Sequence, residues 1–199
     1  MNKGKSDKII DDEALVGAFQ SGNKLVFNDL VLRHKDRVFS LCYRFLGDYQ
    51  EAEDCTQDAF LKVYRSLKRF RFESSFTTWL YRIAVNTCKN RLKSVRYRNI
   101  RKSVSLNNPE NSDENHRSIQ IEDEEKSPMA EFEKKERMRL IQKAIDSLST
   151  EQKSVLILRD IEGLSYEEIV SITGCRLGTL KSRLARARHG LRERLEGII

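Results

Sequence analysis

The sequence predicts an all-α fold of two small helical domains joined by a flexible linker, and three observations carry this prediction. Apolar residues recur every three or four positions from Asp11 to about Arg98 and again after Ser127, which is the helical period. Only two prolines occur in 199 residues, while charged residues make up 34%, and this composition favours helix over sheet. Between the two periodic stretches, polar and acidic residues dominate residues 99–126, which carry too little apolar surface to order themselves.

These patterns divide the chain into four segments. They are a polar tail (1–10), an N-terminal helical domain (11–98), an acidic flexible linker (99–126) and a C-terminal helical domain (127–199). A linker of about 30 residues reaches at most roughly 100 Å, so the two domains can grip DNA sites about 30 base pairs apart.

Capping residues mark the expected helix ends in the N-terminal domain. Gly22 and Gly47 stand at breaks in the apolar periodicity. Asp48, with Glu51 three positions later, is typical of an N-cap, and Ser75 can cap a helix that continues through Lys93. The domain should therefore contain several helices separated by short turns.

The C-terminal domain carries two capping boxes and two glycine stops. Ser149 with Gln152 and Ser165 with Glu168 fit the capping box, and Gly163 and Gly174 can end the preceding helices in a left-handed turn. With Ser127 before Pro128 as a further helix start, the expected helices end near Ser147 and then cover 150–162, 166–173 and 177 onward. A short helix, a glycine turn and a longer helix form the helix-turn-helix pattern.

The last helix has an apolar stripe and a polar, basic face. The stripe, expected to face the core, consists of Leu177, Leu180, Leu184, Ala187 and Leu191. Short polar side chains let a helix approach base edges, while arginine can bond guanine with two hydrogen bonds. The predicted duplex-DNA residues are Arg176, Thr179, Lys181, Ser182, Arg183 and Arg186. The alternative is an ordinary amphipathic helix with a solvated basic face, but such faces usually mix charge signs.

A second candidate surface lies in the N-terminal domain and suits single-stranded DNA. An aromatic and basic loop precedes a helix on which Trp79, Arg82, Asn86 and Lys89 share one sector. Rings can stack on displaced bases, an amide can bond a base edge, and cations can follow the backbone. The predicted residues are Lys68, Arg69, Phe70, Arg71, Phe72, Ser74, Trp79, Arg82, Asn86 and Lys89. Taken alone, Trp79 is as readily a core residue.

An acidic and amide face forms a third candidate surface. Asp54, Gln57 and Asp58 extend beyond what helix capping requires. On a protein with a net charge of +7, such a face indicates either a protein partner or a simply solvated surface.

Charge and cysteine content limit the remaining function classes. Seven basic residues lie in 89–102 and seven more in 176–194, which favours a polyanionic partner. No stretch resembles a signal peptide or a membrane span, so we expect a cytoplasmic protein without membrane insertion. The four cysteines have no paired spacing, and we expect buried small apolar residues, no metal and no cofactor.

Three motifs together resemble the bacterial sigma-70 family, specifically its small extracytoplasmic-function (ECF) sigma factors. They are "GDYQEAEDCTQDAFLKVYRSLKRF", "FTTWLYRIAVNTCKNRLKS" and "LSYEEIVSITGCRLGTLKSRLARARHGLRERL". The resemblance implies a non-enzymatic subunit that binds core RNA polymerase, directs it to promoter DNA, helps to open the strands and is held by an anti-sigma factor. It also implies that Asp54, Gln57 and Asp58 meet polymerase, that the single-strand set meets the minus-ten element and that the duplex set meets the minus-thirty-five element.

Two positions depart from the family pattern, and two other classes of protein remain open. Asn90 stands where aspartate is common, and Arg176 stands where proline usually precedes the recognition helix, so the promoter sequence is not fixed by the resemblance. A conventional helix-turn-helix regulator would bind duplex operators without polymerase. An enzyme acting on nucleic acid would need clustered carboxylates for metal or a nucleophile with its base, and neither stands out in the sequence.

Overall fold

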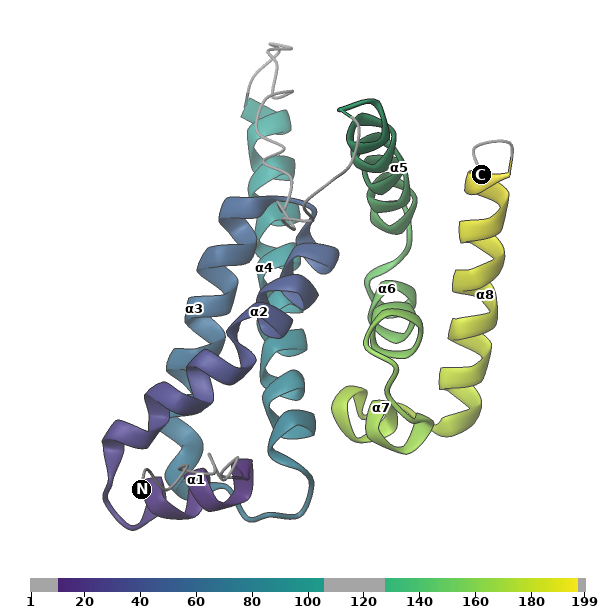
Figure 1. Ribbon diagram of the computed structural model, residues 1–199. Helices are drawn as coiled ribbons and strands as arrows, with labels where there is room; N and C mark the ends of the chain where they lie inside the picture. Colours follow the sequence, from purple (N-terminus) through teal and green to yellow (C-terminus); the bar gives the residue numbers. More distant parts are fainter. Residues whose placement is uncertain (1–10, 106–127, 197–199) are drawn as a thin grey trace, which may run out of the picture.

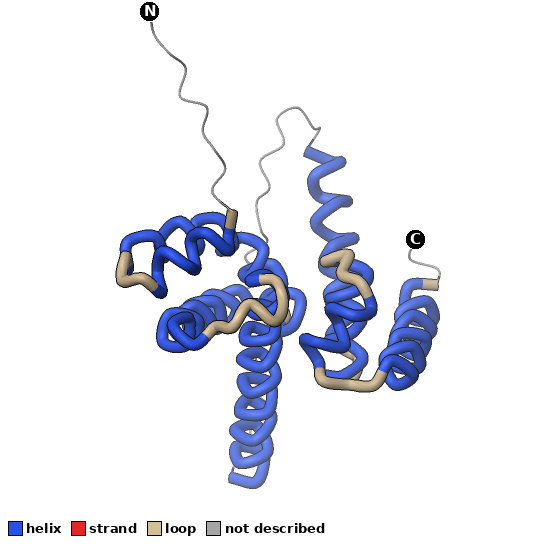
Figure 2. Tube along the Cα trace, turned by 90° about the horizontal axis from the view of Figure 1, so that it is seen from below, coloured by secondary structure: helices blue, strands red, loops and turns tan. Residues whose placement is uncertain are grey.

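Helices make up every regular element in the part of the chain that the structure describes, residues 11–105 and 128–196 of a computed structural model (Figure 2). No described helix is both long enough and apolar enough to cross a bilayer. The elements are α1 (Asp12–Gln20), η1 (Lys24–Val26), α2 (Phe27–Leu46), α3 (Tyr49–Ser66), η2 (Leu67–Arg69), α4 (Phe76–Ser105), α5 (Pro128–Asp146), α6 (Thr150–Leu156), the π-helical turn η3 (Ile157–Ile161), α7 (Tyr166–Thr173) and α8 (Leu177–Leu195).

Helices α2, α3 and α4 form the core of the N-terminal half, and α1 packs on α2 (Figure 1). Each of the three contributes an apolar stripe at the predicted helical spacing; Leu41 and Phe45 of α2 and Val63 of α3 are completely buried. Gln20 of α1 donates hydrogen bonds to the carbonyls of Leu67 and Phe70, at 3.1 and 2.8 Å. The N-terminal half is thus a helical bundle whose connecting turns are held by α1.

The predicted caps are confirmed. Asp48 accepts a hydrogen bond from the Glu51 backbone N–H at 2.7 Å, and Ser75 accepts one from Thr78 at 3.1 Å. Both capping boxes are complete, with Ser149 and Ser165 each exchanging two bonds with the residue three positions later. These side chains satisfy backbone donors that the first turn of a helix leaves without partners.

Three expectations about helix ends need correction. α4 continues to Ser105 rather than ending near Lys93, because neither glycine nor proline interrupts residues 76–108. The helix expected over 150–162 changes at Ile157 into a π-helical turn, where Glu162 N–H bonds the Ile157 carbonyl. Leu177 is 44% exposed in the first turn of α8, so the core stripe begins at Leu180. The proposed cap Ser127 lies outside the described residues.

In the C-terminal half, α5, α6 and α7 all pack against α8, and Figure 1 shows the three in one column beside it. Four successive residues at the end of α6 and the start of η3 are buried: Val155, Leu156, Ile157 and Leu158. Successive residues of a helix point in different directions, so burial on one face alone would not cover all four. They can all be buried because α6 and η3 are covered from two sides, by α8 and by α2 of the other half. The widened turn lies within this doubly covered segment.

The two halves contact each other directly. α4 stands between the α2–α3 pair and the column formed by α5, α6 and α7 (Figure 1). Lys153 of α6 is only 4% exposed, and its ammonium donates to the Phe45 carbonyl at 3.0 Å and to Asp146 at 2.7 Å. Gln142 of α5 donates to the Arg44 carbonyl at 3.2 Å. The carboxyl end of α2 is therefore the point where the C-terminal half is attached.

Three of the four cysteines meet in the centre of the N-terminal half, where all three are completely buried. Cys42 comes from α2, Cys55 from α3 and Cys88 from α4; the Cys88 sulfur lies 3.5 Å from that of Cys55 and 3.6 Å from that of Cys42. The expectation of buried cysteines is confirmed for these three. Hydrogen bonds from Cys55 and Cys88 lower the pKa of the Cys42 thiol, and the same bonds raise the pKa of the other two thiols.

We predict that Gly47→Ala destabilises the protein by about 2–4 kcal/mol. Gly47 ends α2 with a φ of +74°, which disfavours any side chain, and an added Cβ would lie 2.6 Å from Asp146 Oδ2, displacing the carboxylate that holds Lys153. Urea unfolding of both proteins measures the change. Gly17→Ala is the control, since Gly17 is helical with open space around it and should gain up to about 1 kcal/mol. Equal stabilities for the two variants would contradict the strain at Gly47.

Candidate nucleic-acid interface

The turn between α7 and α8 fixes the orientation of the last helix. Gly174 adopts a left-handed conformation with a φ of +69°, and its N–H bonds the Val170 carbonyl at 2.8 Å. The chain then enters α8 through Arg176 in an extended conformation. This geometry is the one that the glycine stop predicted, because only glycine adopts it without a steric penalty.

The polar face of α8 lies largely at the surface. Leu180, Leu184 and Ala187 are buried and hold the helix against the core. On the other side, four of the six predicted duplex residues are exposed and two are half-buried: exposed Arg176, Lys181, Ser182 and Arg186, half-buried Thr179 and Arg183. Arg186 Nε bonds the Ser182 carbonyl at 3.3 Å, which leaves its terminal nitrogens free to donate outward. All six residues thus lie on α8 or at its N-terminus, and none of them is buried.

The aromatic loop before α4 has one buried and one exposed ring. Phe70 is buried and contacts Trp79, with ring centroids 5.0 Å apart, so it supports the loop and does not present its face to a ligand. Phe72 is 44% exposed and has a φ of +57°, a conformation that is strained for a bulky residue. Of the two rings, Phe72 is the one that a base could stack on.

Trp79 belongs to an aromatic cluster. It contacts Phe70 and Phe76, whose centroids lie 5.0 and 6.1 Å away, and it is half-buried. Trp79 therefore packs in part against the core, and its partial exposure leaves the predicted contact with single-stranded DNA sterically open.

The rest of the α4 sector faces the C-terminal half. Arg82 donates to the Ser171 hydroxyl of α7 at 2.7 Å, and its neighbour Tyr81 donates to Glu162 at 2.7 Å. Burial lowers the pKa of Lys89, and the charge of Arg183 acts in the same direction. Asn86 remains exposed. Sequence reasoning placed these side chains on one sector but missed their contact with α7, which no local spacing reveals.

The remaining single-strand candidates lie in or beside the loop. Lys68, Arg69 and Arg71 are exposed, and Ser74 is half-buried. Arg71 lies 3.9 Å from Glu73, and both side chains are about 80% exposed, so this pair contributes little to stability. The three cations are therefore accessible to a ligand.

Of the residues predicted on the acidic face of α3, Asp54 forms an ion pair, while Gln57 and Asp58 form none with the residues that the structure describes. Arg91 of α4 bonds Asp54 at 2.9 Å and also Glu51, and these bonds raise the pKa of the guanidinium. Gln57 and Asp58 lie exposed one turn further along. Asp54 therefore anchors α3 to α4, while the other two present an accessible surface.

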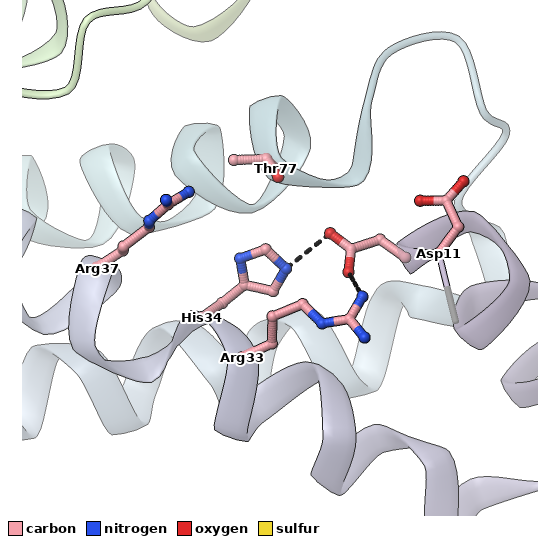
Figure 3. Close-up of a pocket in the computed structure, with 6 residues that line it drawn as sticks. Asp11, Arg33, His34, Arg37 and Thr77 are labelled. Atoms are coloured by element: carbon pink, nitrogen blue, oxygen red, sulfur yellow. Dashed lines mark hydrogen bonds and ion pairs between the residues drawn. The ribbon is translucent and has the colours of Figure 1, made fainter. Parts of the chain in front are cut away.

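A polar hollow lies at the corner of α1 and α2 (Figure 3). Asp12 accepts from Arg33 at 2.6 Å, and its second oxygen lies 2.7 Å from His34 Nε2. The lining is completed by Asp11, Arg37 and Thr77. The imidazole is buried and lies against the Phe76 ring, with centroids 5.4 Å apart. Because Asp12 holds two partners on α2, this cluster attaches α1 to the bundle.

Comparison with known proteins identifies both halves. The model of Sigma-70 region 2 matches residues 30–98, and that of Sigma-70, region 4 matches residues 138–189. The chain is 37% identical over 188 residues to the RNA polymerase sigma-H factor of Pseudomonas aeruginosa, covering 94% of this chain and 95% of that protein. It is 36% identical over 190 residues to the ECF RNA polymerase sigma-E factor of Escherichia coli strain K12, covering 96% and 97%.

A solved structure shares the arrangement. The sigma factor RpoE from Bartonella quintana, crystallised with the anti-sigma factor NepR, superposes with a TM-score of 0.65 at 26% identity, over 85% of this chain and 96% of that one. The likeness extends across both halves of the described chain.

We predict that the double variant Tyr81→Phe, Ser171→Ala loosens the contact between the halves. The variant removes the Tyr81–Glu162 and Arg82–Ser171 hydrogen bonds. Together these two bonds contribute about 2 kcal/mol, which corresponds to roughly 30-fold in the ratio of closed to open molecules. Small-angle X-ray scattering of the full chain should then give a larger radius of gyration. The control pair is Tyr64→Phe, Ser66→Ala, because Ser66 bonds only its own helix and Tyr64 packs within the N-terminal half. An unchanged radius in the first variant would show that these bonds do not hold the halves together.

Proposed function

The chain belongs to the sigma-70 family, within its ECF group of sigma factors, and we propose that its two halves read promoter DNA through separate helices. Such a subunit binds RNA polymerase and directs it to promoters. In this proposal α8 contacts duplex DNA at the minus-thirty-five element. The loop before α4, together with α4 itself, contacts the minus-ten element as the strands separate.

The surface of α8 supports the first assignment. Its small residues Thr179 and Ser182 let the helix backbone approach the major groove, and Arg186 beside them has donors for a guanine edge. Arg176, Lys181 and Arg183 surround this patch and are suited to phosphate contacts, which set the register of the helix on DNA. Acids are absent from this patch, so nothing within it competes with phosphate for these cations.

The loop and α4 support the second assignment. The exposed Phe72 ring offers a stacking surface, and Asn86 offers an amide for a base edge. Lys68, Arg69 and Arg71 provide positive charge along the approach. Phe70 is assigned a supporting role, because it holds Trp79 and Phe72 in place through ring contacts of 5.0 and 4.9 Å.

The polymerase contact is assigned to the exposed part of the acidic face. Gln57 and Asp58 project from α3, and Asp54, tied to Arg91, keeps that face in register with α4. A contact here would connect the polymerase to the helix that carries the single-strand surface. The work of the protein is binding without catalysis, in the cytoplasm, where RNA polymerase acts on DNA.

The closed arrangement supports control by an anti-sigma factor. Arg82 and Lys89 are half-buried against the C-terminal half, so a strand of DNA can reach them only in part in this state. A protein that stabilised the closed state would keep the single-strand surface covered. The Bartonella quintana relative was crystallised with the anti-sigma factor NepR, and we extend this kind of partner to the present chain.

One observation carries the whole proposal: each half exposes a basic surface, and the two surfaces differ in chemistry. The surface of α8 combines cations with short polar side chains, and that of the loop and α4 combines cations with an exposed ring and an amide. A decisive experiment combines the purified full chain with core RNA polymerase on genomic fragments and maps the RNA start sites. Specific starts that require both components support the proposal. Tight operator binding by the chain alone, without starts, would instead indicate a conventional regulator.

We predict that Arg186→Ala lowers promoter affinity of the polymerase complex by about 5- to 150-fold, equivalent to about 1–3 kcal/mol for one bidentate base contact. The loss should be specific to promoters with the preferred upstream element. Arg192→Ala is the control, since it removes the same charge from an exposed site on another face of α8. Competition binding measures both variants. Equal losses would mean that α8 contributes charge rather than base recognition.

We predict that Phe72→Gly weakens binding of the complex to an unpaired minus-ten strand by about 5- to 150-fold, the cost of one lost stacking contact of about 1–3 kcal/mol. Folding stability should stay level or rise, because glycine relieves the positive φ at this position. Fluorescence anisotropy with single-stranded and duplex oligonucleotides separates the two effects. Phe72→Tyr keeps the ring and should retain binding. Undiminished single-strand binding by Phe72→Gly would remove this residue from the site.

A further inference from the structure

The three-cysteine cluster combines features that core packing alone does not require. Cys42, Cys55 and Cys88 come from three different helices, and their sulfur atoms all lie within 4.8 Å of one another. Cysteines acting only as small apolar residues could be scattered through the core, whereas here each sulfur has the other two as neighbours. Three thiols that converge on one point form a chelating set for a thiophilic centre.

The spacing of the three sulfurs matches the bond length that a shared central atom would require. Separations of 3.5 and 3.6 Å, with the third at most 4.8 Å, put the point equidistant from the three sulfurs roughly 2–2.4 Å from each. A sulfur bond to a soft metal is about 2.3 Å long. The cluster therefore needs little rearrangement to bind one atom.

The buried surroundings of the cluster determine which charge a bound central atom can carry. All three cysteines are completely buried in the largely apolar α2–α4 core. The polar groups near them are the Thr56 side chain beside Cys42 and the Arg91 guanidinium near Cys55, whose charge is already paired with Glu51 and Asp54. Three thiolates around a monovalent or divalent cation would leave net negative charge in this core, which is costly. Zinc also takes a fourth ligand, and no histidine or carboxylate joins this cluster among the described residues. A trivalent centre with three sulfur ligands carries no net charge.

We propose that Cys42, Cys55 and Cys88 form a binding site for a trivalent metalloid, with arsenite, As(OH)₃, as its representative ligand. The binding step exchanges ligands without redox chemistry. Three As–O and three S–H bonds break, three As–S bonds form, and three water molecules leave. Arsenic stays trivalent, and neither the ligand nor the product places a charge in the core.

Binding would link α2, α3 and α4 covalently. Because the ligand is small and neutral, it can enter through local opening of the bundle without carrying charge into the interior. Uptake should be slow, since the cluster has no exposed sulfur. Once closed, the linkage restrains the unfolded chain as a disulfide does, so the folded protein gains stability.

The test uses the reduced full-length chain, incubated with sodium arsenite and then separated from free arsenite. Native mass spectrometry should show the mass of one arsenic minus three hydrogens, which identifies three As–S bonds. The melting temperature should rise by roughly 5–10 °C. The arsenite-treated protein is then alkylated, first folded and afterwards unfolded in the alkylating reagent. Half-buried Cys175 should be modified, whereas the three cysteines bound to arsenic should remain unmodified even after unfolding.

Matched serine variants identify the site. Cys55→Ser should lower arsenite retention at least tenfold under competing glutathione, and Cys175→Ser should bind like the parent protein. Circular dichroism checks that each variant is folded, and the mass and alkylation results on the parent protein do not depend on any variant. The proposal is overturned if the parent retains no arsenic, if the bound arsenic keeps a hydroxyl, if Cys175→Ser abolishes binding, or if zinc is retained and arsenite is not.

Discussion

The buried ammonium of Lys153 is the interaction on which the arrangement of this molecule depends. An unpaired charge in a protein interior costs several kcal/mol, so it must lie where partners are provided. Here they are the Phe45 carbonyl at the end of α2 and the Asp146 carboxylate at the end of α5. The carboxyl end of a helix also carries partial negative charge, which favours a cation. The C-terminal half is therefore held against α2 in the position that gives the Lys153 ammonium both of its partners.

The contacts of α4 follow from this position. With α6 fixed at the end of α2, α7 lies against α4, and the Tyr81–Glu162 and Arg82–Ser171 bonds can form. Arg82, which we propose to contact single-stranded DNA, thus also holds the closed state. The proposed duplex-DNA face of α8 is less involved, since four of its six residues stay exposed. Closure therefore covers the proposed single-strand surface more than the proposed duplex surface.

Local features of the fold could be read from the sequence, and features that join distant segments could not. Capping depends on residues three positions apart, so the boxes at Ser149 and Ser165 were predictable and are present. The burial of Lys153 could not be predicted, because a lysine in a polar stretch looks the same in the sequence whether its side chain is exposed or buried. The same holds for the cysteines, which lie 13 and 33 residues apart and meet only when three helices pack. For the candidate site, helical spacing could place residues on a common sector of a helix, but the burial of Phe70 and the contact of Arg82 with α7 depend on tertiary packing.

The two halves are joined by the 22 residues between Ser105 and Pro128, and this length has a thermodynamic consequence. A tether of this size keeps the halves at an effective mutual concentration in the millimolar range, so a weak contact is enough to close the molecule. Because closure is intramolecular, dilution does not affect it. Binding to a second protein is intermolecular, so the fraction of molecules held by that protein does change with concentration.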